Sequence, residues 1–187
     1  MGKIVLGAVI PDQAKCPPKG RRRAPFGERK MTIPRSIAEL DFSRMKQKLL
    51  DPEEGAGLNT TEIDLAEREY RKFLALHLAC PDIPLVPNRL VDLMWHAHIL
   101  DTQRYADDCN RLFGHVMHHD PYVGIDGPDS VLELHALFEE TRRAYERSFG
   151  PYPLDRLAAV RCKGHACHVP TPCACRVPGA CNSIRAA

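Results

Sequence analysis

Histidine and acidic side chains are concentrated between Trp95 and Asp120, and both residue types bind transition metals or transfer protons. The candidate metal ligands within this segment are His96, His98, Asp101 and His119. Zinc, copper and non-haem iron all accept imidazole nitrogen and carboxylate oxygen, so the residue types do not choose among them. If the segment is catalytic, Tyr105 is the candidate proton donor, and Asp101 is a ligand or a group that orients one.

The two histidines of the Trp-His-Ala-His run point in different directions if they lie on a helix. A helix turns about 100° per residue, which places His96 about 160° away from His98. One ion therefore cannot be held by both from one face. His98 falls on the apolar stripe, where it is either a hydrogen-bonded core residue or a ligand that meets His119 as the chain folds back. His96 lies on the side of Asp92.

A second candidate metal-binding element lies at the end of the chain. Thiolate and imidazole at this density suit zinc or copper(I), although the spacing matches no standard zinc finger. A tail with reduced cysteines and no metal is the alternative. The tail candidates are Cys162, His165, Cys167, His168, Cys173, Cys175 and Cys181.

Helical periodicity predicts the elements that position these side chains. Apolar residues recur at helical spacing over about 37–49, 60–80, 88–113 and 129–149, and no segment alternates as a strand would. The fold class is therefore all-α, a small bundle of four to five helices. We expect an irregular arm over 1–36, a helical domain over 37–155 and a Cys-rich tail over 156–187.

Composition narrows the function classes. Hydrophobic residues make up 44% of the 187 residues, enough for one core, and a net charge of +2 gives no overall field that recruits nucleic acid. No apolar run is long enough to span a membrane, and no secretory signal is evident, so a cytoplasmic protein is expected. The Pro-rich, basic segment from Lys15 to Lys30 is the one candidate for contact with nucleic acid.

The segment from Val91 to Cys109 resembles the core motif of the glycine-rich domain-containing protein-like family. The pattern is Trp-His-x-His, an Asn or Asp, a tyrosine and then Asp-Cys, carried here by Trp95, Asp101, Tyr105 and Cys109 among others. The resemblance extends over about 37–155. It implies a domain without an established biochemical activity, related to plant proteins associated with stress, and it groups His96, His98, Tyr105 and Cys109 in one family-typical feature.

Together these observations predict a metal-binding helical protein that acts as a binding or scaffold module. Zinc is the expected metal, with copper or iron as alternatives. Two other functions stay open: a metal-dependent oxidoreductase that uses the region of His98 and His119, and a nucleic-acid-associated adaptor that uses the basic arm. A protein partner is compatible with each of these, and a membrane partner is not expected.

Overall fold

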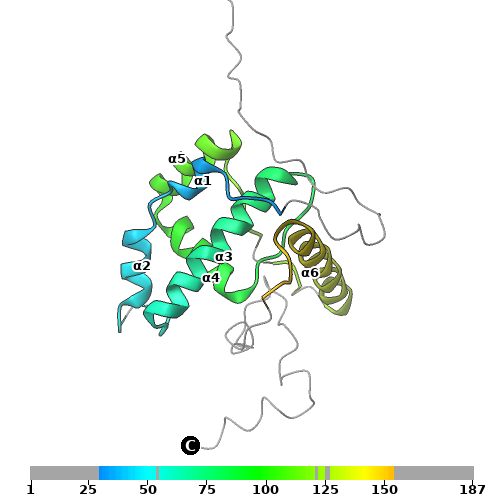
Figure 1. Ribbon diagram of the computed structural model, residues 1–187. Helices are drawn as coiled ribbons and strands as arrows, with labels where there is room; N and C mark the ends of the chain where they lie inside the picture. The colour runs from blue at the N-terminus through cyan, green and yellow to red at the C-terminus, as the bar shows by residue number, and fades with distance from the viewer. Residues whose placement is uncertain (1–29, 54, 121, 125–126, 154–187) are drawn as a thin grey trace, which may run out of the picture.

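The computed structural model describes residues 30–53, 55–120, 122–124 and 127–153, and within these ranges the chain is helical, without strands (Figure 1). This confirms the all-α prediction. No helix among these residues is long and apolar enough to cross a membrane. The helices are α1 (Arg35–Ala38), α2 (Ser43–Leu50), α3 (Thr60–Ala79), α4 (Arg89–Leu100), α5 (Thr102–Phe113) and α6 (Pro128–Phe149).

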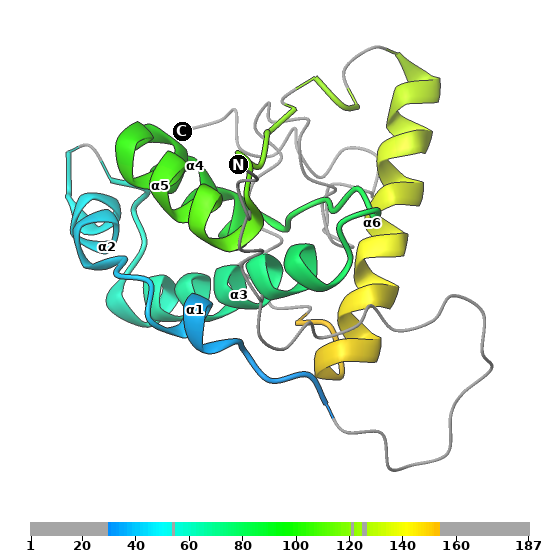
Figure 2. The same cartoon turned by 90° about the horizontal axis from the view of Figure 1, so that it is seen from above.

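The central helix is α3, which contacts α1, α2, α4 and α6. It begins with a capping box: the Asn59 side chain accepts from the Glu62 backbone N–H, and the Glu62 carboxylate accepts from the Asn59 N–H. It ends at Ala79, two residues before Pro81 and close to the end of the predicted segment over 60–80. Figure 2 shows α2 near one end of α3 and α6 at the other, so α3 joins the two parts of the hydrophobic core.

The first predicted helix is two short helices, α1 and α2, which corrects the single segment expected over 37–49. Asp41 lies between them, and its carboxylate accepts hydrogen bonds from the Ser43 backbone N–H and hydroxyl at the start of α2. The Ser43 hydrogen bonds, with a contribution from Arg104, lower the pKa of Asp41 to about 2. A local polar contact thus restarts the helix in a new direction.

The third predicted helix is also divided, at Asp101, into α4 and α5. Asp101 has φ −85° and ψ 68°, outside the helical region, and no proline or glycine marks the position. In an unbroken helix, residues ten positions apart are separated by about 15 Å along the axis. The break lets Trp95 Nε1 donate to the Tyr105 hydroxyl at 2.9 Å, so both helices share one core.

The last helix, α6, packs most of its predicted apolar stripe toward α3, whereas Val131 at the start of that stripe is 39% exposed. Its buried residues include Leu134, Phe138 and Tyr145. The Tyr145 hydroxyl donates to Glu69 Oε2 at 2.6 Å and accepts from Lys72 Nζ at 2.8 Å. Glu69 is 3% exposed, so this network both fastens α6 and satisfies a buried carboxylate.

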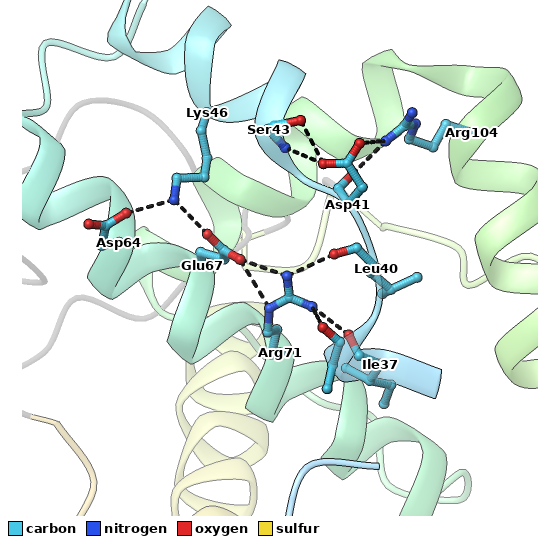
Figure 3. A network of polar contacts seen from close by, with 10 residues as sticks. Ile37, Leu40, Asp41, Ser43, Lys46, Asp64, Glu67, Arg71 and Arg104 are labelled. Carbon is cyan, nitrogen blue, oxygen red and sulfur yellow. Dashed lines mark hydrogen bonds and ion pairs between the residues drawn. The ribbon is translucent and has the colours of Figure 1, made fainter. Parts of the chain in front are cut away.

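Arg71 of α3 holds the N-terminal segment in place (Figure 3). Its guanidinium donates to the backbone carbonyls of Ile37, Ala38 and Leu40, and it pairs with the Glu67 carboxylate at 2.6 Å. Lys46 of α2 donates to Asp64 and pairs with Glu67. The planar guanidinium of Arg71 has several N–H donors in a fixed geometry, so it donates to these carbonyls at the same time. The ammonium group of a lysine does not match this geometry.

We expect Arg71→Lys to lower the free energy of unfolding by about 1–2 kcal/mol, because the part-buried carbonyls of Ile37 and Leu40 lose donors. Urea unfolding of the two proteins measures the difference. The matched control is Arg68→Lys on the same helix, where the side chain is 66% exposed and pairs with Glu69, and it should change stability by less than about 0.5 kcal/mol. Equal losses in the two variants would contradict the anchoring role of Arg71.

Candidate functional site

Asp92, His96 and His119 form a group able to hold a metal ion. Asp92 and His96 lie one turn apart on α4, and His119 lies in the segment after α5. Asp92 Oδ1 is 3.3 Å from His119 Nε2, and Asp92 Oδ2 is 3.6 Å from His96 Nδ1. One donor atom from each residue lies within 4.8 Å of the other two.

The spacing of these atoms suits a first-row metal ion. Bonds of about 2.0–2.2 Å to nitrogen and oxygen at tetrahedral angles place neighbouring ligand atoms about 3.4 Å apart. The carboxylate oxygens of Asp92 stand at 3.3 Å and 3.6 Å from the two imidazole nitrogens. These two distances use different oxygens of the carboxylate. With one donor atom from each residue, the separations reach at most 4.8 Å, so the donors draw together by about 1.4 Å or less to close on an ion. The same contacts also give a buried carboxylate two polar partners when no ion is present.

The three side chains of the Asp92, His96 and His119 group differ in how far they are buried. Asp92 and His119 have side chains that are 5% and 9% exposed, whereas the His96 side chain is 38% exposed. A carboxylate at this depth is costly unless opposite charge or donors offset its desolvation. The exposed edge at His96 leaves the group open to ions from solvent.

The chain that carries His119 is fixed at two points. Gly114 ends α5 with φ 78°, a left-handed conformation that turns the backbone back toward α4. The Tyr105 hydroxyl donates to the Met117 carbonyl. The His119 ring then packs on Trp95, with the ring centroids 4.7 Å apart. These contacts set His119 opposite Asp92.

His98 lies in the core and outside this group. It is 1% exposed, and its ring packs against Phe42 and Tyr105. Its Nδ1 shares a hydrogen bond of 2.9 Å with the Tyr70 hydroxyl, and its Nε2 lies 3.3 Å from Asp108 Oδ2 without hydrogen-bond geometry. Burial lowers the pKa of His98, and Asp108 opposes that shift. His98 therefore has the surroundings of a core histidine.

The other two predicted residues are engaged elsewhere. Asp101 stands at the break between α4 and α5, with Oδ2 at 3.8 Å from Arg104 Nε. The Tyr105 hydroxyl is held between Trp95 and Met117, and burial raises its pKa above the ordinary range for tyrosine. A phenol held in this way links elements of the fold.

Of the predicted bundle candidates, the structure brings together His96 and His119. The partner that sequence reasoning missed is Asp92. Its signal was present, because residues four apart on a helix share a face and Asp92 lies four before His96. The seven Cys and His candidates of the tail, from Cys162 to Cys181, lie outside the described residues, so their binding of metal stays a prediction.

The fold and the group define a small helical domain with a cluster of two histidines and one aspartate, formed by α4 and the segment after α5. The chain belongs to the UCP032817-like family, whose sequence model matches residues 34–133. It is also 37% identical over 65 residues to Glycine-rich domain-containing protein 1 of Arabidopsis thaliana. That segment is 35% of this chain and 8% of the plant protein. The resemblance stated from the Trp-His-x-His motif is therefore confirmed. No solved structure matches the chain.

We expect Tyr70→Phe to lower the free energy of unfolding by about 1–3 kcal/mol. The carboxylate of Asp108 favours the tautomer with its proton on Nε2, so His98 Nδ1 accepts from Tyr70 and loses its donor in the variant. Chemical denaturation measures the loss. Tyr122→Phe removes a hydroxyl from a side chain that is 65% exposed and should leave stability within about 0.5 kcal/mol. Similar values for both variants would show that the buried hydrogen bond contributes nothing.

Proposed function

We propose that this chain is a metal-binding module that holds one transition-metal ion, zinc in the first place, through Asp92, His96 and His119. The observation that carries the proposal is the convergence of three donor atoms within 4.8 Å of one another, from two turns of a helix and a separate segment. Two imidazoles and one carboxylate are ligands for which zinc has high affinity.

Two features of the surroundings support a bound ion. Asp92 is 3% exposed, and a divalent cation offsets the desolvation of its carboxylate more fully than hydrogen bonds from imidazole rings do. His119 is held by ring packing on Trp95 and by the anchored segment before it, so little conformational freedom is lost when an ion binds. Rigid ligands of this kind favour affinity.

The proposal predicts one equivalent of zinc that depends on all three residues. Purified chain is equilibrated with zinc, freed of excess metal by gel filtration and analysed by plasma mass spectrometry. His96→Ala, His119→Ala and Asp92→Asn should each weaken binding by at least about 100-fold, more than the loss of an outer-shell partner. Competition with a chelator gives the affinities.

Two controls separate this site from other ligands in the chain. His115→Ala removes an exposed histidine outside the group and should retain the full equivalent. A chain with the five tail cysteines replaced by serine should also retain it. Zinc that disappears only with the cysteines would overturn the proposal, as would loss of the equivalent in His115→Ala or absence of zinc from the wild-type chain.

A metal-dependent enzyme is the second candidate, and the number of ligands favours it. Structural zinc sites usually close with four protein ligands, whereas catalytic sites use three and keep a position for water or substrate. Two histidines and one carboxylate are also the ligands of non-haem iron oxygenases. The described residues supply three ligands for the group around Asp92. The open position is where a metal-bound water would act as nucleophile or a substrate would bind.

An open position predicts that a small anion adds to the bound ion. Cobalt(II) is substituted for zinc in the chain with serine at the five tail cysteines, and its visible absorption is recorded while azide is added. A saturable change in the cobalt spectrum is the expected result. A spectrum that stays constant up to high azide would indicate a closed site and exclude the catalytic candidate while leaving metal binding intact.

A further inference from the structure

A cavity of about 240 Å³ lies beside the candidate metal centre and is separate from it. It is lined by α3, α4, α6, the link over 81–87, residues 117–120 and Val123, and it is partly open to solvent. Apolar side chains supply most of its wall, among them Phe73, Leu134 and Leu137. Neither Asp92 nor His96 lines it, whereas Trp95 and His119 do. The cavity therefore has its own lining and touches the metal group at one residue.

The size and the apolar wall select a small aromatic molecule. An apolar cavity of about 150 Å³ is enough to bind benzene, and sites for larger ligands begin near 300 Å³. At about 240 Å³ the cavity has room for one substituted ring. The rings of Phe73 and Trp95, whose centroids are 5.3 Å apart, both contribute to the wall and offer edges and faces to such a ligand.

The polar residues of the cavity wall indicate which substituent the aromatic ring of the ligand should carry. Among the described lining residues the polar side chains are His77, His118, His119 and Asp120, and no lysine or arginine is present. Burial, with a smaller contribution from His115, lowers the pKa of His77, which favours its neutral form. The Asp120 carboxylate accepts hydrogen bonds, and the neutral His77 imidazole has one acceptor nitrogen beside its N–H donor, so a ligand with a hydroxyl group finds an acceptor at both places. An anionic ligand would face the charge of Asp120 without a cationic partner.

We propose that this cavity binds a neutral hydroxylated aromatic molecule of the phenol class. The ring occupies the apolar part between Phe73, Trp95 and α6, and the hydroxyl donates to a histidine or to Asp120. This site goes beyond metal binding and does not depend on it. His119 lines the cavity, so the ligand also lies against one residue of the metal group.

The probe for this proposal is 4-methylphenol, compared with toluene and benzoate on the full chain. The chain has one tryptophan, so a single indole N–H signal in a nitrogen-15 NMR spectrum reports on Trp95 at the cavity wall. We expect a saturable shift of this signal with 4-methylphenol. Toluene, which lacks the donor, and benzoate, which carries a negative charge, should each bind at least about tenfold more weakly.

Two cavity variants and one matched control locate the binding. Leu137→Phe fills part of the cavity and should weaken binding of 4-methylphenol by at least about tenfold. Leu132→Phe makes the same change on α6 at a side chain that is 67% exposed, and binding should be unaffected. Asp120→Asn removes the negative charge without filling space, so its expected effect is tighter binding of benzoate by several-fold.

The His96→Ala chain separates this proposal from the metal proposal, because His96 does not line the cavity. Retained binding of 4-methylphenol by that chain supports an independent site. Absence of a saturable shift in the wild-type chain, or equal binding by the Leu137→Phe and Leu132→Phe proteins, would overturn the cavity proposal. So would benzoate binding as tightly as 4-methylphenol. None of these results would alter the zinc content that tests the metal centre.

Discussion

The change of chain direction at Asp101 is the constraint on which the arrangement of the site depends. It brings α5 back against α4, so that Tyr105 accepts from Trp95 and Asp108 reaches the buried edge of His98. Tyr105 in turn donates to the carbonyl of Met117, two residues before His119. The position of the second histidine of the metal group is thus set through a hydrogen-bonded path that begins at the break. An unbroken helix would carry α5 and the following segment away from Asp92.

Hydrogen bonds and ion pairs of buried polar groups hold the helices together. The buried carboxylates of Glu69 and Asp92 have partners of different kinds. Glu69 receives a hydrogen bond from Tyr145 and an ion pair from Lys72, both held by side chains of the fold. Asp92 has two imidazoles whose nitrogens stand 3.3 Å and 3.6 Å from its oxygens. Since imidazole nitrogen also binds metals, the residues around Asp92 are able to hold a metal ion, whereas the tyrosine and lysine around Glu69 are not typical metal ligands.

Helical periodicity and capping signals predicted most of the fold because they are local. The capping box at Asn59, the end of α5 at Gly114 and the apolar stripe of α6 follow from residues close in sequence. The break at Asp101 was not predictable in this way, since no proline or glycine is present and the energy that favours it comes from contacts ten residues apart. For the same reason Asp108 was missed as the neighbour of His98. Asp92 was within reach of sequence reasoning through its spacing from His96.

The two histidines of the Trp-His-Ala-His run show how one short motif serves two purposes. Their angular separation on α4 directs His98 into the core, where Tyr70 and Asp108 surround it, and directs His96 to the half-exposed group with Asp92. Trp95, whose direction on the helix lies between those of His96 and His98, packs on His119 and lines the cavity.

A substitution at His98 therefore acts on the stability of the whole domain. One at His96 removes a candidate metal ligand at the half-exposed edge of the group, where the fold has little dependence on it. The motif thus joins a rigid interior to a candidate binding site through positions two residues apart on one helix. This arrangement requires α4 to stay regular through both histidines, and to end at Leu100 so that α5 can pack against it.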